Sequence, residues 1–87
     1  MKRLEIELLN ETGLHARPAS LFVKTASDFV SHVTLSKGER KCDAKSIMGV
    51  LSLGAVKGDQ LVVEAEGSDE DAAIEAIQKL IENNFGE

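Results

Sequence analysis

The sequence predicts an α+β fold, an open-faced sandwich of element order βαββαβα. We expect a four-stranded, mostly antiparallel sheet with three helices packed on one face. Several short segments alternate apolar and polar residues, which is typical of strands with one wet face. Two longer segments repeat apolar residues at helical spacing. With 87 residues and no linker or internal repeat, residues 1–87 are expected to form a single domain.

The first half of the chain predicts a strand, a helix and a hairpin. Lys2 to Leu9 alternate in polarity and predict the first strand. A helix is expected from Ala16 to Phe29, and its buried positions are Ala19, Phe22, Val23 and Ala26. The second strand, His32 to Ser36, turns at Gly38 into the third, Arg40 to Asp43.

The second half predicts a short helix, a strand and a long helix. Ser46 precedes the apolar segment 47–53, which ends at Gly54, and Gln60 to Glu66 alternate as the fourth strand. Ser68 is expected to cap the last helix, and Asp69, Glu70 and Asp71 to complement its dipole. Its buried stripe is expected to comprise Ile74, Ile77, Leu80, Ile81 and Phe85, with Gly86 as the stop.

Composition excludes several classes of function. The formal charge of −5 argues against direct nucleic-acid binding, which needs a basic face. A single cysteine, Cys42, excludes an internal disulfide and fits a reducing cytoplasm. No apolar run approaches the roughly 20 residues that span a membrane, and no signal peptide is evident. We therefore expect a cytoplasmic protein without membrane insertion, cofactor or metal site, and a monomer, because no sizeable self-complementary surface is evident.

The candidate reactive segment is Gly13-Leu14-His15-Ala16-Arg17-Pro18-Ala19. Pro18 lacks an amide hydrogen, so a helix must begin within a few residues of it, near His15. The free amides of a helix start attract anions, and a neutral imidazole is a nucleophile near neutral pH. We expect His15 to carry a phosphoryl group, the amides of Ala16 and Arg17 to bind its oxygens, and the Arg17 guanidinium to offset its charge. The alternative is that His15 merely caps the helix.

A docking surface is expected beside this segment. On the wheel of the first helix, Arg17, Leu21 and Lys24 lie opposite the buried face, with Ser20 beside them. The segment after Ser46 is apolar nearly all round, so some of its residues must face water or a partner. The predicted partner-binding residues are Thr12, Ser20, Leu21, Lys24, Ile47, Met48 and Leu51.

Ser46 combines a structural and a regulatory interpretation. A serine at this position is expected to be the N-cap of the short helix. A phosphate there would meet the positive end of the helix and place about two negative charges beside the docking surface. We therefore expect phosphorylation of Ser46 to act as a switch at the surface.

These residues resemble the HPr family, the histidine-containing phosphocarriers of the bacterial phosphoenolpyruvate:sugar phosphotransferase system. Two motifs carry the resemblance, residues 12–19 around His15 and residues 45–54 around Ser46, and the match covers the whole chain. The resemblance implies that His15 takes a phosphoryl group at Nδ1 from phosphorylated enzyme I. It then passes the group to IIA domains of sugar permeases, with Arg17 as the main charge partner. Such a protein is a stoichiometric carrier rather than an enzyme.

The second motif resembles the form found in low-GC Gram-positive bacteria. It implies that an ATP-dependent HPr kinase/phosphorylase modifies Ser46. The modified form slows sugar uptake and acts in carbon catabolite repression, and hence in transcription regulation, with the catabolite control protein CcpA.

Two other functions remain as alternatives. A purely regulatory interaction module would act through Ser46 alone, with His15 as a relic or cap. The related paralogue Crh keeps the serine but lacks the active-site histidine, so His15 argues against Crh. An enzyme that hydrolyses acyl phosphates is disfavoured, because the sequence has no constellation of residues that activates water. Replacement of His15 distinguishes the carrier from the regulatory module.

Overall fold

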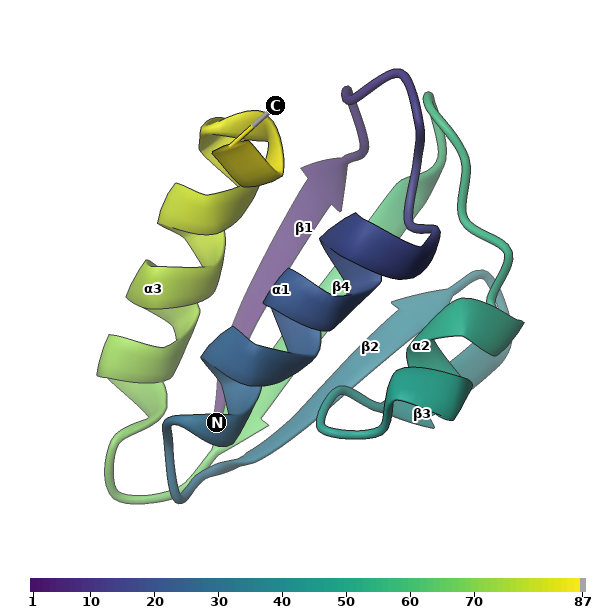
Figure 1. Cartoon of the computed structure of the whole chain (residues 1–87). Coiled ribbons are helices and arrows are strands. Elements are labelled where there is room, and N and C mark those ends of the chain that lie inside the picture. Colours follow the sequence, from purple (N-terminus) through teal and green to yellow (C-terminus); the bar gives the residue numbers. More distant parts are fainter. Residues whose placement is uncertain (87) are drawn as a thin grey trace.

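The computed structural model describes residues 1–86 and has the predicted element order (Figure 1). The strands are β1 (Lys2–Glu7), β2 (His32–Lys37), β3 (Arg40–Asp43) and β4 (Gln60–Glu66). The helices are α1 (Ala16–Ser27), α2 (Ile47–Ser52) and α3 (Glu70–Glu82), followed by a 3-10 turn, Asn84–Gly86. Among the described residues, none of the helices is both long and apolar enough to cross a membrane.

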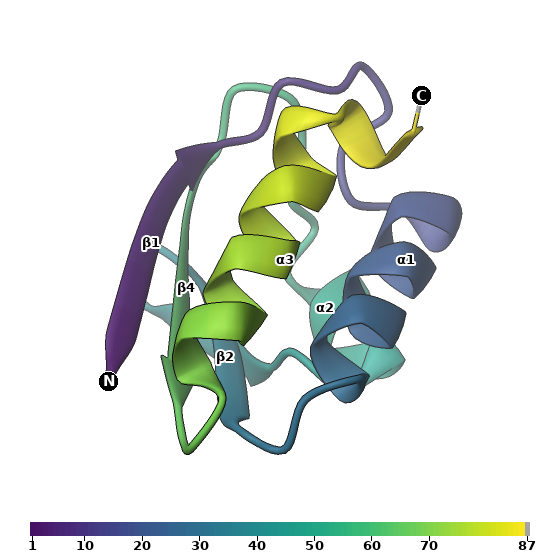
Figure 2. The same cartoon turned by 90° about the vertical axis from the view of Figure 1, so that its left-hand side faces the viewer.

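The four strands form one sheet in the order β1-β4-β2-β3, and every neighbouring pair is antiparallel. The register places Val63 of β4 between Leu4 of β1 and Leu35 of β2, so apolar residues of three strands share one face. Figure 2 shows all three helices on one side of this sheet. The predicted open-faced sandwich is confirmed.

The core lies between the sheet and the helices. Its largest fully buried side chains include Phe22 of α1, Leu35 of β2 and Ile77 of α3, together with Phe85. Burying each of these apolar side chains stabilises the fold by about 1.5–3 kcal/mol relative to exposure. The packing fixes α1 against both the sheet and α3, which gives the start of α1 a rigid support.

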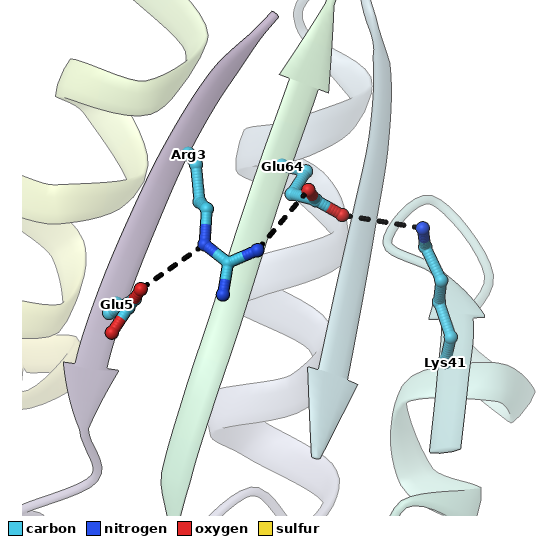
Figure 3. A network of polar contacts seen from close by, with 4 residues as sticks. All are labelled: Arg3, Glu5, Lys41 and Glu64. Carbon is cyan, nitrogen blue, oxygen red and sulfur yellow. Dashed lines mark hydrogen bonds and ion pairs between the residues drawn. The ribbon is translucent and has the colours of Figure 1, made fainter. Parts of the chain in front are cut away.

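The other face of the sheet carries polar side chains that pair across the strands. The Arg3 guanidinium lies between the carboxylates of Glu5 and Glu64, and Glu64 also contacts Lys41 (Figure 3). These ion pairs link β1, β4 and β3, and they satisfy charges that the alternating pattern directs outward. The open face is therefore polar, as the sequence predicts.

Several predicted element ends were wrong. The first strand ends at Glu7 rather than Leu9, and α1 ends at Ser27 rather than Phe29. The second strand extends one residue further than predicted, to Lys37. Such ends depend on partner strands and on caps, which a periodic pattern does not reveal.

The predicted Ser68 cap was also wrong. Asp69 is the N-cap residue of α3, and its side chain makes no cap hydrogen bond. The Asp69 carboxylate instead accepts hydrogen bonds from the amides of Val30 and Ser31, and the Glu70 carboxylate accepts one from the amide of Gly67.

In the predicted stripe of α3, Ile74, Ile77 and Ile81 are buried and Leu80 is partly buried, but Phe85 does not belong to the helix. The helix ends at Glu82, and Asn84 and Phe85 both adopt left-handed conformations, with φ of 49° and 56°. This turn returns Phe85 to the core, where it is only 2% exposed. Phe85 is thus a core residue as predicted, but the chain positions it by a turn.

Candidate functional site

His15 is the N-cap residue of α1. Its backbone is extended, with φ of −98° and ψ of −161°, and its carbonyl accepts a hydrogen bond from the amide of Ala19 at 2.9 Å. Its side chain is exposed and makes no cap hydrogen bond. The residue therefore starts the helix through its backbone alone, which leaves the imidazole accessible to a reaction partner.

The first turn of α1 lies beside this imidazole. The first amides of a helix have no intrahelical partner, and Pro18, which is buried, contributes none. The amides of Ala16 and Arg17 therefore remain for an anion. The Arg17 side chain is exposed and forms no ion pair within residues 1–86, and no carboxylate lies in the first turn. Positive partial and full charges thus meet beside His15 without local competition.

The segment before His15 is held tightly by the connection between α2 and β4. Leu14 is 3% exposed, and its amide donates to the carbonyl of Ala55 at 3.0 Å. Gly13 has a φ of +64°, and a Cβ at this position would lie 2.6 Å from the Ala55 oxygen. Only glycine fits this close approach in this conformation. Thr12 is exposed, and its hydroxyl accepts a hydrogen bond from the Asn10 side chain at 3.3 Å.

The predicted docking surface combines residues of α1 and α2, which lie side by side (Figure 1). Met48 is 75% exposed, and Ile47 and Leu51 are each 36% exposed. Ser20 and Lys24 of α1 are exposed as well. We define the docking surface as Ser20, Leu21, Lys24, Ile47, Met48 and Leu51.

Two side chains near this surface are half-buried. Leu21 is half-buried and packs against the core, because α2 lies beside α1. Lys45 is half-buried too, since its ammonium donates to the carbonyl of Phe29 at 2.7 Å. Leu21 is therefore a partly covered edge of the docking surface rather than its exposed centre.

Ser46 is the N-cap residue of α2, as predicted. Its hydroxyl accepts a hydrogen bond from the amide of Gly49 at 3.2 Å. Cys42 lies close by, because a Cβ at Gly49 would stand 3.2 Å from the Cys42 Cβ. Burial, helped by the charge of Asp43, raises the pKa of the Cys42 thiol, which keeps it in its unreactive form.

Three residues that support the site were not identified from the sequence. Arg40 donates to the carbonyl of Ser52 at 2.7 Å, and Lys37 donates to that of Gly54 at 3.4 Å. Both cations therefore bind the C-terminal end of α2, where the helix dipole favours positive charge. Asp59 forms an ion pair with Lys37 at 2.9 Å. All three contacts join residues more than ten positions apart, so no local pattern reveals them.

The chain matches a known protein family over nearly its whole length. A family model described as the PTS HPr component phosphorylation site matches residues 2–83. The chain belongs to the HPr family. HPr proteins are phosphocarriers of the phosphotransferase system rather than catalytic enzymes, and their partners in that system include enzyme I and IIA domains.

The relatives cover the chain from end to end. The phosphocarrier protein HPr of Neisseria meningitidis is 42% identical over 87 residues, which is 100% of this chain and 98% of the relative. The crystal structure of HPr from Thermoanaerobacter tengcongensis superposes with a TM-score of 0.97 at 54% identity, covering 100% of this chain and 98% of that one. A structure of an HPr dimer from the same organism has a TM-score of 0.81 and covers both chains fully.

Crh, a catabolite repression protein of Bacillus subtilis, is also similar. Its crystal structure, described as a dimer with a swapping domain, has a TM-score of 0.76 at 40% identity and covers 97% of each chain. The HPr fold thus occurs both in carriers and in a protein named for catabolite repression.

Proposed function

We propose that His15 is the phosphoryl acceptor of this HPr, and that it receives the group from phosphorylated enzyme I. The observation that carries the proposal is the exposed His15 imidazole, which makes no cap hydrogen bond and lies beside the first-turn amides and Arg17. A carrier needs a nucleophile together with groups that position and neutralise the transferred phosphoryl group. The start of α1 offers each of these.

The transfer forms one bond and breaks one. The Nδ1 lone pair of His15 attacks phosphorus, a P–N bond forms, and the bond between phosphorus and the donor breaks. The amides of Ala16 and Arg17 donate to the phosphoryl oxygens, and the Arg17 guanidinium balances their charge. Attack by a nucleophile of a IIA domain of a sugar permease then releases the imidazole again.

The docking surface is the region we assign to both partners. Met48, Ile47 and Leu51 form its apolar centre, and Lys24 supplies a cation on the α1 side. Arg17, at the start of the same helix, adds a second cation outside the docking surface. Thr12, which is exposed and lies three residues before His15 in the sequence, is assigned to the same contact. A carrier must release each partner quickly, so we expect small interfaces of modest affinity. We further propose that the protein works as a monomer in the cytoplasm.

We propose a second role for Ser46, as the target of an HPr kinase/phosphorylase. Its N-cap position supports the proposal, because a phosphate there meets the positive helix end and need not unfold α2. The added charge of about −2 would stand next to Ile47 and Met48, where it opposes docking of acidic partners. Binding of the modified form to the catabolite control protein CcpA would link it to carbon catabolite repression.

The likeness to Crh supports one alternative, a module that acts through Ser46 alone. The two functions differ in whether His15 is required. In the regulatory module, His15 would serve only the backbone start of α1.

Intact-protein mass spectrometry tests the carrier function. The protein is incubated with phosphoenolpyruvate, Mg²⁺ and a bacterial enzyme I, and the same is done with His15→Ala and Ser46→Ala. We expect a single acid-labile phosphoryl group on the wild type and on Ser46→Ala, and none on His15→Ala. A folded wild type that stays unlabelled, with an enzyme I shown to be active on another carrier, would contradict the proposal. A kinase assay with ATP on Ser46 would then test the regulatory module.

A further inference from the structure

The connection from α2 to β4 runs beside the connection that leads to His15, and the two lie together at one end of the molecule (Figure 1). Backbone hydrogen bonds join the two connections at both ends of the one that leads from α2 to β4. The amide of Leu8 donates to Asp59 at 2.9 Å, that of Gly58 donates to Leu8 at 2.7 Å, and that of Leu14 donates to Ala55 at 3.0 Å. The segment before His15 therefore takes its position from residues 55–59.

The Asp59 carboxylate holds residues 55–59 in shape. Its Oδ2 accepts a hydrogen bond from the amide of Val56 at 2.8 Å, and the Asp59 amide donates to the Val56 carbonyl at 3.0 Å. The same Oδ2 pairs with the Lys37 ammonium at 2.9 Å, and Lys37 also reaches the carbonyl of Gly54. The hydrogen bond from Val56, followed by that from Lys37, lowers the pKa of Asp59, so the carboxylate is charged at neutral pH.

The two connections pack closely against each other at Gly13. A Cβ at Gly13 would lie 2.6 Å from the Ala55 oxygen and 2.9 Å from the Val56 Cα. A shift of Ala55 and Val56 is therefore transmitted to Gly13 and Leu14. The His15 imidazole makes no cap hydrogen bond that would restrain it independently of its backbone.

We propose that Asp59 is a positioning residue for His15, acting through Val56, Ala55 and Leu14, with Lys37 holding its carboxylate. The role rests on the proposed function of His15 as phosphoryl acceptor. Misplacement of a reacting group by about 1 Å can cost about a hundredfold in rate, so a loosened support is visible in transfer kinetics. Neither Asp59 nor Lys37 belongs to the docking surface, so loss of the support should change the transfer step more than the docking step.

Two measurements on Asp59→Ala test this role. The first is the steady-state rate of phosphoryl transfer from enzyme I as a function of carrier concentration. We expect kcat to fall about tenfold with KM nearly unchanged, because the docking surface is intact. The second is hydrogen exchange of the Leu14 amide, measured by NMR, which we expect to be at least several-fold faster than in the wild type.

Further variants keep the test decisive. Asp71→Ala removes an exposed carboxylate from α3 with the same change of net charge, and should alter neither measurement. Lys37→Gln removes the ion pair but leaves the Val56 hydrogen bond, so a smaller loss of about two- to threefold in kcat is expected. If Asp59→Ala fails to fold, Lys37→Gln and Asp59→Asn, which retains an oxygen acceptor for Val56, carry the test.

The outcomes separate the positioning role from the carrier function. An Asp59 variant with wild-type protection of Leu14, or with faster exchange but an unchanged kcat, overturns the positioning role. A wild type that accepts no phosphoryl group from an active enzyme I overturns the carrier function itself, and the positioning role with it. Slower transfer with faster Leu14 exchange, absent in Asp71→Ala, supports both.

Discussion

The carboxylate of Asp69 joins the turn after α1 to the start of α3. It accepts hydrogen bonds from the amides of Val30 at 2.9 Å and Ser31 at 3.0 Å, and from the Ser31 hydroxyl. Ser31 is only 1% exposed, so its hydroxyl needs this partner inside the protein. Gly67 permits the approach, because a Cβ there would lie 2.6 Å from the Ser31 oxygen. The Asp69 side chain thus links the turn after α1 to the start of α3, at the end of the molecule opposite His15.

These contacts predict how stability depends on pH at this position. The hydrogen bond from the Ser31 hydroxyl, followed by that from the Val30 amide, lowers the pKa of Asp69 below its ordinary value of 3.8. A carboxyl whose pKa is lower in the folded state stabilises the fold above its unfolded pKa, and this contribution is lost as pH falls below 3.8 through the lowered value. We expect Asp69→Asn to reduce the free energy of unfolding at pH 7. The deficit relative to the wild type should shrink below pH 3.8.

Urea unfolding of both proteins over the acidic range measures this difference. Glu75→Gln serves as the control, because the exposed pair of Glu75 with Lys79 contributes little. A deficit of Asp69→Asn that stays constant down to the most acidic point would contradict the prediction.

At the level of elements, the sequence was sufficient for the order of strands and helices and for the start of α1. Alternation identified β1, β2 and β4, and the turn at Gly38 indicated β3. Pro18 placed the helix start near His15, because proline fits only the first turn. The local preference of serine for N-caps likewise identified Ser46. The hydrogen bonds of Asp69 to Val30 and Ser31 and the ion pair of Asp59 with Lys37 were not predicted, because these partners lie far away in the sequence. The end of α3 was misplaced because Phe85 adopts a left-handed conformation that is unusual for a bulky residue, although Asn84 before it is a residue type that favours this conformation.

The short helix α2 allows docking to be tested separately from stability. Met48 is 75% exposed, so Met48→Asp should change the free energy of unfolding by no more than about 0.5 kcal/mol. If α2 forms the centre of the docking surface, the new charge should raise KM for transfer from enzyme I by about tenfold. The bound complex still presents His15 in the same way, so kcat should stay close to the wild-type value.

Ala72→Asp is the matched control for this experiment. It introduces the same charge at an exposed position of α3, outside the docking surface. An equal rise of KM in both variants would indicate a general effect of charge and would argue against a role of α2. A rise confined to Met48→Asp would support it.

Across the whole molecule, charge is distributed unevenly. The formal net charge is −5, and the acidic side chains include Glu5 and Glu64 on the open face of the sheet and Glu70, Asp71 and Glu75 on α3. On α1 and α2, beside His15 and across the docking surface, the exposed charges are the cations Arg17 and Lys24. The protein is therefore acidic as a whole but carries cations on the helix that His15 begins. The total charge is evident from the sequence, but only the packing of α1 on the sheet separates the two regions.

This separation decides the sign of the salt effect on transfer. At about 0.1 M salt the screening length is about 10 Å. The molecule measures 33 × 26 × 20 Å, so a partner at the docking surface senses Arg17 and Lys24 more strongly than the distant carboxylates. We expect kcat/KM for transfer from enzyme I to fall several-fold as NaCl rises from about 20 to about 300 mM. Lys24→Gln should flatten this dependence, whereas Lys41→Gln, on the open face of the sheet, should leave it unchanged. A rate that rises with salt would mean instead that the net negative charge governs the encounter, and that the cations near His15 act only after docking.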